Sequence, residues 1–304
     1  MCLASARFAR GSELEWQLRY LFSSHRRPNL PELPEVEQIV RALGQTIHGR
    51  RILAAELRLK RTAPGISARN FDRQLRNSVI TAVNRRGKYI LIELDSQLVL
   101  TTHLRMTGKF LSVGHGEKLP PYAHVVFHLD DERMLVFCDM RQFGRMRILR
   151  TNKLALAPEI SALAPEPFSD GFTSDYLISV LSRSRRSLKQ LLLDQTKVLG
   201  LGNIYASEAL FLAKINPFKS AATLSRKRAL MLHQAIRDVL QEAIDAGSTL
   251  NINLTDGGGT YFETPERFWR VYERDGEPCI NCGTKIRRVV HGGRSTYFCP
   301  KCQK

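Results

Sequence analysis

Four cysteines near the end of the chain have a spacing typical of a metal site. Cys279 and Cys282 form one C-x2-C pair, and Cys299 and Cys302 form a second pair after sixteen intervening residues. Two such pairs can supply four thiolates to one tetrahedral Zn²⁺. Because four protein ligands leave no open coordination position, we predict a single structural zinc with no chemical role. A redox dithiol and two chance pairs are the alternatives.

The segment that contains these cysteines is strongly basic. Residues 279–304 have no Asp or Glu, and their cationic side chains are Lys285, Arg287, Arg288, Arg294, Lys301 and Lys304. A finger with this charge is suited to contact phosphates. Arg294 follows two glycines and precedes a serine, and these small neighbours would let its guanidinium approach a DNA strand. The alternative is a solvated arginine near the zinc cluster.

The composition of the whole chain favours a polyanionic partner. Its 304 residues include 46 Lys and Arg against 29 Asp and Glu, a net charge of +17, with 43% hydrophobic and 25% charged residues. These totals predict a soluble globular protein that binds nucleic acid, although a well-solvated basic surface would give them too. The chain lacks the ~20 consecutive apolar residues of a membrane span, and residues 1–30 lack a secretory signal. We therefore expect a cytoplasmic protein, nucleoid-associated when bound to DNA, with no membrane partner.

Hydrophobic periodicity divides the chain into a β-rich and an α-rich part. Apolar residues recur at helical spacing over 35–47, directly after Pro34, so an amphipathic helix is expected there. Short β-branched or aromatic runs follow at 51–59, 78–83, 88–94, 98–106, 124–129 and 133–138. These runs predict an antiparallel sandwich or barrel over 51–138. Helical periodicity returns at 173–182, 187–194, 203–214 and 225–246.

These elements predict an α+β protein built from several parts. In chain order we expect an extension at 1–30 that is removed or non-native, a catalytic β-sandwich domain at 31–150, a hinge at 151–170, a helical domain at 171–260 and the zinc finger at 261–304. A ligand that contacts both large domains would most naturally bind between them.

Six further motifs occur in a fixed order along the chain. They are Pro31-Glu-Leu-Pro-Glu-Val-Glu37, Arg85-Arg-Gly-Lys-Tyr89, His103-Leu-Arg-Met106, Asp139-Met-Arg-Gln-Phe-Gly144, Leu192-Leu-Asp-Gln195 and Gly200-Leu-Gly-Asn-Ile-Tyr205. Together with the four-cysteine finger they resemble the formamidopyrimidine-DNA glycosylase family over residues 31–304. The resemblance implies a helix-flanked antiparallel β-sandwich, a helix-two-turn-helix domain and a C-terminal zinc finger.

The resemblance assigns catalytic roles at the start of this region. Pro31 would be the nucleophile, because a free α-amine titrates near ~7.7–8 and is partly neutral at physiological pH. Its attack on the sugar C1′ would expel the damaged base and leave an iminium ion that acidifies C2′. Glu32 is suited to acid-base work at the sugar, with Glu35 in support. Without the resemblance, Pro31 is a loop proline and both carboxylates merely complement a helix dipole.

The resemblance also assigns contacts with phosphates. Lys88 would bind a phosphate and donate a proton during β-elimination, and Arg294 would act in the later phosphate elimination. Asn203 and Tyr205 belong to a G-x-G-N turn at a helix start, whose amides can bind a phosphate. Further backbone contacts are expected from His124, Arg185 and Lys189. As isolated residues, all of these would be ordinary cap, strand or surface groups.

A base inside a duplex cannot meet an N-terminal amine, so the damaged nucleotide must be flipped and its gap filled. By resemblance, Met106 and Phe143 would prop the base stack open, and Arg141 would hydrogen-bond the orphaned partner base. The alternative places Met106 and Phe143 in the core of the β-domain.

The chain departs from the family pattern at Pro31, which lies inside the sequence as an amide without a free lone pair. Leu30 occupies the position of the family's initiator methionine. We expect translation to begin at a Leu-type codon read as Met, with residues 1–30 outside the active protein. A pro-segment cleaved before Pro31 and an inactive homologue are the alternatives.

The expected substrate follows from the branch that the motifs resemble. Leu33 and the Arg141-Gln-Phe-Gly144 segment resemble enzymes acting on 8-oxoguanine and ring-opened purines, although the loop at 253–266 departs from the common form. We expect a monomeric bifunctional glycosylase and AP lyase that cleaves damaged double-stranded DNA by β,δ-elimination. The alternatives are an endonuclease VIII-type glycosylase for oxidised pyrimidines and a non-catalytic zinc-dependent DNA-binding protein.

Overall fold

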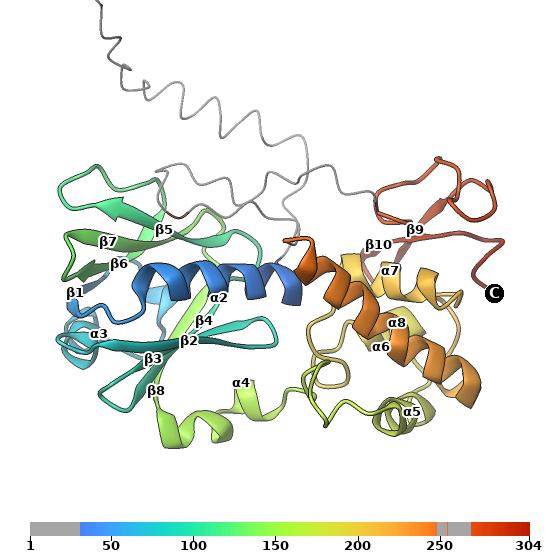
Figure 1. The fold of residues 1–304 in the computed structure, drawn as a ribbon, viewed down its shortest axis with the longest axis horizontal. Helices are drawn as coiled ribbons and strands as arrows, with labels where there is room; N and C mark the ends of the chain where they lie inside the picture. The colour runs from blue at the N-terminus through green and yellow to red at the C-terminus, as the bar shows by residue number, and fades with distance from the viewer. Residues whose placement is uncertain (1–30, 248–253, 255–268) are drawn as a thin grey trace, which may run out of the picture.

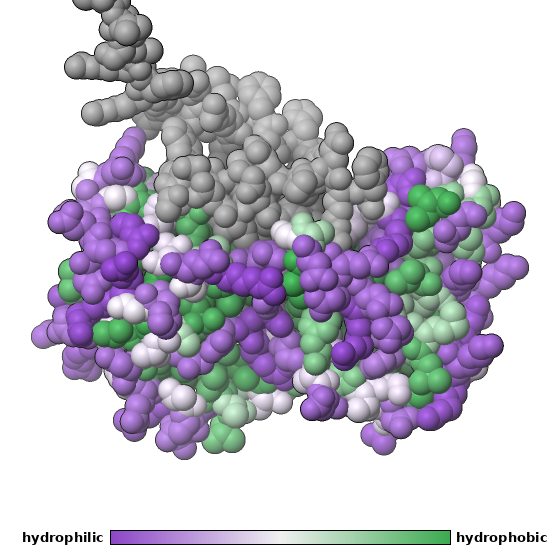
Figure 2. All heavy atoms as spheres, in the orientation of Figure 1, coloured by the Kyte–Doolittle hydropathy of each residue, from purple (hydrophilic) through white to green (hydrophobic). Residues whose placement is uncertain are grey.

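The computed structural model describes residues 31–247, 254 and 269–304. Figure 1 shows a half built of β-sheets beside a half built of helices, and each half has its own hydrophobic core. Helix α2 (Leu33–Ile47) connects them, because Leu33 belongs to the helical core and the rest of its buried face to the β-core. The face shown in Figure 2 is largely hydrophilic, as the charge of the chain leads one to expect.

The β-rich half is a sandwich of two four-stranded antiparallel sheets. One sheet has the order β1-β6-β7-β5, with bounds Ile52–Leu57, Ala123–Leu129, Arg133–Asp139 and Gly108–Gly114. The other has the order β2-β3-β4-β8, with bounds Ile80–Arg86, Tyr89–Leu94, Leu98–His103 and Arg145–Arg150. Helix α2 packs on the second sheet, and α3 (Ala68–Leu75) packs on β1. The predicted helix-flanked antiparallel sandwich is therefore confirmed.

Three elements of this half were not predicted. Strand β5 begins and ends at a glycine, and three arginines interrupt the apolar residues of β8, so neither has a strong strand pattern. Helix α3 buries only Phe71 and Leu75 within an otherwise polar segment. In β8 and α3 the local sequence carries too few apolar residues to be recognised, and in β5 the flanking glycines obscure the apolar residues that it buries.

The α-rich half contains the four expected helices. They are α5 (Ser174–Ser182), α6 (Leu188–Leu192), α7 (Asn203–Leu212) and α8 (Arg226–Asp245). Thr173, Ser187 and Ser225 cap α5, α6 and α8 by accepting a backbone N–H. Helix α7 is buried on nearly all sides, so it is the central helix of this half. Among the described residues, none of the helices combines the length and apolarity that crossing a membrane requires.

Two short helices lie in the segment predicted as a hinge. They are η3 (Thr151–Leu156), which directly follows β8, and α4 (Pro158–Ser161), which follows η3. Beyond them, the carboxylate of Glu166 accepts a hydrogen bond from Gly87 N at 2.6 Å and from Arg85 Nη1 at 2.8 Å. The connection between the two halves is thus tied to the turn between β2 and β3.

A buried carboxylate attaches the C-terminal hairpin, β9 (Arg287–His291) and β10 (Arg294–Phe298), to the helical half. Glu208 on α7 is 1% exposed and accepts hydrogen bonds from the backbone N–H groups of Arg270, Val271 and Tyr272, each at 3.0 Å. These amides precede the first pair of zinc-binding cysteines. Glu208 therefore fixes the start of the finger against the central helix.

We expect Glu208→Gln to lower the free energy of unfolding by about 1–3 kcal/mol, because an amide oxygen replaces two acceptor oxygens and its NH₂ faces a buried N–H. Urea denaturation of the purified protein measures this. Glu242→Gln is the matched control, since Glu242 also pairs with Arg270 but is half exposed. It should cost less than about 1 kcal/mol. Equal losses in the two variants would contradict the role given to Glu208.

Candidate active site

The carboxylate of Glu32 lies where the two halves meet. Glu32 is the N-cap of α2 and is 1% exposed. Its carboxylate accepts hydrogen bonds from three N–H groups at the start of α7: Gly202 N, Ile204 N at 2.9 Å and Tyr205 N at 3.3 Å. We expected these amides to bind a phosphate, but here Glu32 occupies them. The G-x-G-N turn therefore receives a carboxylate from within the chain.

The glycines of this turn allow the close approach of α2. At Gly202 an added Cβ would collide with the carboxylate of Glu32. At Gly200 the backbone has φ +89°, and an added Cβ would lie 2.5 Å from Leu33 Cδ1. The carbonyl of Gly200 also accepts a hydrogen bond from Leu33 N at 3.1 Å. Both glycines are thus required by contacts with the first two residues after Pro31.

Glu35 completes a capping box and links α2 to Tyr205. Its Oε2 accepts a hydrogen bond from Glu32 N at 3.0 Å, and its Oε1 accepts one from the Tyr205 hydroxyl at 2.7 Å. Tyr205 is fully buried, and its ring packs edge-on against Trp269. In this structure Tyr205 therefore positions Glu35 from inside the protein, and its expected contact with DNA stays a prediction.

Lys88 lies in the turn between β2 and β3 and interacts electrostatically with the carboxylate of Glu32. Its Nζ donates to the carbonyl of Leu201 at 2.8 Å. Burial lowers the pKa of Lys88, Glu32 acts in the opposite direction, and Arg294 lowers it further. Burial also raises the pKa of Glu32 to about 7, although Lys88 and the backbone N–H groups oppose this. An acid directly after Pro31 and an amine that interacts with it thus both have shifted pKa values.

Lys189 is buried and holds the hairpin that carries Arg294. It is 1% exposed, and its Nζ donates to Ser295 O at 2.8 Å and to Thr296 Oγ1 at 3.0 Å. Burial lowers the pKa of Lys189 to about 7, with Glu32 opposing and Arg294 adding to the shift. Arg294 itself is exposed at the start of β10. Lys189 was expected to contact the DNA backbone directly, but here its ammonium binds the hairpin.

His103 was not among the predicted site residues, although it lies in one of the motifs. Its Nδ1 accepts a hydrogen bond from Arg105 N at 3.0 Å, and its ring packs edge-on against Tyr89. Burial, together with the charges of Arg105 and Lys88, lowers the pKa of His103 to about 3. A neutral imidazole therefore lies beside the cationic group of Lys88.

The remaining predicted residues lie on the β-rich half, apart from Arg185 and Asn203. Phe143 is 44% exposed and Arg141 lies over its ring at 5.0 Å, so Phe143 is not a core residue. Met106 is half-buried, and Arg185 is exposed. His124 is buried, and its Nε2 contacts the Asp139 carbonyl at 2.7 Å. The side chain of Asn203 has a buried Oδ1 without a hydrogen-bond partner in the described part of the chain.

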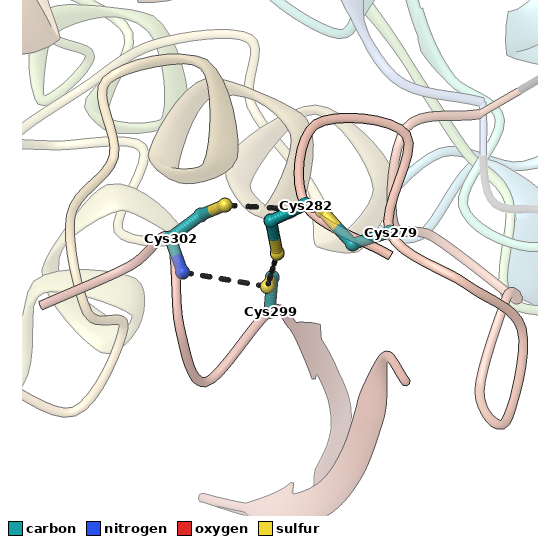
Figure 3. Close-up of side chains that lie close together, drawn as sticks. All are labelled: Cys279, Cys282, Cys299 and Cys302. Carbon is teal, nitrogen blue, oxygen red and sulfur yellow. Dashed lines mark hydrogen bonds between the residues drawn. The ribbon is translucent and has the colours of Figure 1, made fainter. Parts of the chain in front are cut away.

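The four cysteines of the finger converge, as Figure 3 shows, from two loops on either side of the hairpin. Their sulfur atoms all lie within 4.8 Å of one another, with Cys279–Cys302 at 3.9 Å and Cys282–Cys299 at 3.5 Å. Four thiolates around a tetrahedral Zn²⁺ lie about 3.8 Å apart, given Zn–S bonds of about 2.3 Å. The residues fit one structural zinc, as the spacing predicted.

Comparisons with known proteins cover all parts of this architecture. Three family models match: the formamidopyrimidine-DNA glycosylase N-terminal domain at 30–146, its H2TH domain at 163–253, and a zinc finger found in FPG and IleRS at 276–304. A formamidopyrimidine-DNA glycosylase of Pelotomaculum thermopropionicum is 42% identical over 90% of this chain and 99% of the relative. The chain belongs to the formamidopyrimidine-DNA glycosylase family.

Solved structures of this family superpose closely on the chain. The Lactococcus lactis protein in complex with DNA that contains N7-benzyl-Fapy-dG has a TM-score of 0.83 and 33% identity, covering 90% of this chain and all of that one. Its complex with abasic-site DNA has a TM-score of 0.82 and 32% identity, covering 90% and 99%. The Bacillus subtilis formamidopyrimidine-DNA glycosylase is 41% identical over 90% of this chain and 99% of its own length.

We expect the purified protein to contain one zinc per chain, and Cys299→Ser to lose most of it, because three thiolates leave the tetrahedron open. Metal analysis after gel filtration measures this. Cys138→Ala is the control, since Cys138 is a buried cysteine of β7 and is not part of the cluster. A full equivalent of zinc in Cys299→Ser would contradict the four-cysteine site.

Proposed function

We propose that this chain is a bifunctional DNA glycosylase and AP lyase that removes oxidised purines from double-stranded DNA. The observation that carries the proposal is the position of Pro31. It directly precedes Glu32, a buried carboxyl group with a pKa of about 7 that lies beside Lys88. The relatives' names and the lesions in the solved complexes support the substrate class.

The proposed chemistry requires Pro31 as the N-terminal residue. Its nitrogen attacks the sugar C1′, the bond from C1′ to the base nitrogen breaks, and the base leaves with that electron pair and a proton. The bond between C1′ and the ring oxygen then breaks, Glu32 donates a proton to that oxygen, and C1′ is left in an iminium ion with the Pro31 nitrogen. Loss of a proton from C2′ then expels the 3′ phosphate, and a second elimination, assisted by Arg294, expels the 5′ phosphate.

The N-terminal requirement explains how we interpret residues 1–30. Within the 304-residue chain, the nitrogen of Pro31 is an amide and has no lone pair for attack. The family model of the N-terminal domain begins its match at residue 30. We propose that the active protein begins at Pro31, through a start at Leu30 and removal of the initiator methionine. Cleavage of a longer precursor would give the same active N-terminus.

We propose that the DNA binds to exposed side chains on both halves of the molecule. We call residues 105–107 and 140–144 the wedge segments, because they contain Met106, Arg141 and Phe143. Exposed Phe143 with Arg141 over its ring suits insertion at the gap that a flipped base leaves. Arg185 and Arg294 are exposed cations suited to phosphates.

A second candidate substrate is an oxidised pyrimidine. A complex between the Lactococcus lactis relative and DNA with an oxidised pyrimidine is among the similar structures, with a TM-score of 0.82. The relative and this chain share the fold, so this substrate is the alternative. Comparing excision of 8-oxoguanine with excision of an oxidised pyrimidine decides between the two lesion classes.

Borohydride trapping tests the nucleophile. We expect a form whose initiator methionine directly precedes Pro31 to cross-link to a duplex with 8-oxoguanine opposite cytosine, with the adduct on Pro31. The 304-residue chain, purified intact, should not cross-link, because an amide nitrogen forms no iminium ion. Peptide mapping locates the adduct.

Two outcomes of trapping would contradict the proposal. An adduct on a lysine would assign the nucleophile elsewhere. Binding without cross-linking by both forms would favour a non-catalytic DNA-binding protein over an enzyme.

The pH dependence of base excision tests Glu32. We expect a bell-shaped kcat/KM profile for the form that begins at Pro31: the alkaline limb reflects Glu32, whose pKa is about 7, losing the proton it donates, and the acid limb reflects protonation of the Pro31 amine, which titrates near ~7.7–8. Glu32→Gln should lack the alkaline limb and be about 10²–10⁴-fold slower. Glu56→Gln, which alters a carboxylate on β1 paired with Arg58, should keep the parental profile. An unchanged profile in Glu32→Gln would remove Glu32 from the mechanism.

A further inference from the structure

Asp139, the last residue of β7, is a buried carboxylate with partners in both wedge segments. It is 1% exposed. Its Oδ1 accepts hydrogen bonds from the Thr107 hydroxyl and from Arg141 N at 3.2 Å. Its Oδ2 accepts one from Gly144 N at 2.6 Å. One side chain therefore connects the segment of Met106 with the segment of Arg141 and Phe143.

The backbone of Asp139 reaches a third segment. Its N–H donates to the carbonyl of Tyr122 at 3.2 Å, and its carbonyl contacts His124 Nε2 at 2.7 Å. Tyr122 is 48% exposed, which places it on the surface with Phe143 and not in the core. The two wedge segments and the segment that contains Tyr122 thus all contact Asp139 at one end of the sandwich.

Each of these loops contains a non-glycine residue in the left-handed region of the backbone. Arg105 has φ +57°, Tyr122 has φ +60° and Gln142 has φ +58°. Residues other than glycine, asparagine and aspartate rarely adopt this backbone conformation, and it persists only where surrounding contacts impose it. A hydrogen bond with Asp139 lies within two residues of each of the three, and Arg105 N also donates to His103 Nδ1.

The packing around Asp139 leaves little freedom for this arrangement. At Gly144 an added Cβ would lie 2.6 Å from Phe137 Cζ and 3.1 Å from Asp139 Oδ2. The Thr107 hydroxyl donates to Asp139 and also accepts from Arg141 N at 3.1 Å, so the two wedge segments contact each other as well. A carboxylate suits this position because two oxygens must accept hydrogen bonds from both segments.

We propose that Asp139, together with Thr107, is the positioning group that holds Met106, Arg141 and Phe143 ready for insertion into the base stack. This inference rests on the proposed function, since it assigns an energetic role to the wedge segments in recognising the lesion. Preformed wedge segments lower the ordering cost of binding, so their loss should weaken binding to a flipped site more than binding to undamaged DNA.

The test compares two duplexes bound by the 304-residue chain. One duplex contains a tetrahydrofuran abasic analogue with 2-aminopurine beside it, and the other is undamaged. The ratio of the two Kd values reports lesion selectivity, and 2-aminopurine fluorescence reports unstacking. Both readouts are independent of the Pro31 amine.

Thr107→Val and Thr107→Ser are the decisive pair. Valine has nearly the shape of threonine without its hydroxyl, whereas serine keeps the hydroxyl. We expect Thr107→Val to reduce selectivity about five- to tenfold and to lower the fluorescence change, and Thr107→Ser to stay within twofold of the parent. Asp139→Asn should act in the same direction as Thr107→Val. Thr101→Val is the control: Thr101 lies on β4 and is also buried, and losing its hydroxyl should leave both readouts unchanged.

The outcomes separate this inference from the proposed function. Folded Thr107→Val and Asp139→Asn proteins with parental selectivity would overturn the role of Asp139. Equal losses on both duplexes would overturn it too, because they would show only a general structural defect. If neither the 304-residue chain nor the form that begins at Pro31 distinguishes the two duplexes, the proposed function is overturned, and this inference with it.

Discussion

The two halves of the molecule depend on the hydrogen bonds of one buried carboxylate, that of Glu32. It caps α2, which belongs mainly to the β-core, and it also accepts three N–H groups at the start of α7, the central helix of the other core. A buried carboxylate without such donors would be strongly destabilising. The same bonds that join the halves therefore also keep this carboxyl group in a dry environment, where burial raises its pKa to about 7.

Other charged groups near this junction are held in a comparable way. Glu166 binds the turn that carries Lys88, Lys189 binds the strand that carries Arg294, and Glu208 binds the amides that precede the finger. Each contact joins segments that are far apart in the chain. Because their partners are mostly backbone groups, these bonds fix position and direction, and the exposed cations remain available for phosphates.

The sequence predicted features that depend on local pattern. The four cysteines, the helix at 35–47 and most of the strands were recognised from spacing alone, and the family's motifs indicated where Glu32 and Lys88 lie. Glu166 and Glu208 were not recognised, because their partners are mostly backbone N–H groups at distant positions, which leave no trace in residue spacing. Asp139 lies in one of the motifs, but its bond to the distant Thr107 hydroxyl gave no sequence signal. Lys189 was predicted to contact the DNA backbone, and no sequence signal indicated that it is buried against a hairpin.

The location of Glu32 has a mechanical consequence. Its bonds cross the junction beside those of Leu33 with Gly200 and of Lys88 with Leu201, so a change in the angle between the two halves would pivot near this group of bonds. Points on an axis of rotation move least, and points far from it sweep the longest arcs. Pro31, one residue before Glu32, would therefore keep nearly the same place relative to the β-rich half and to the helical half.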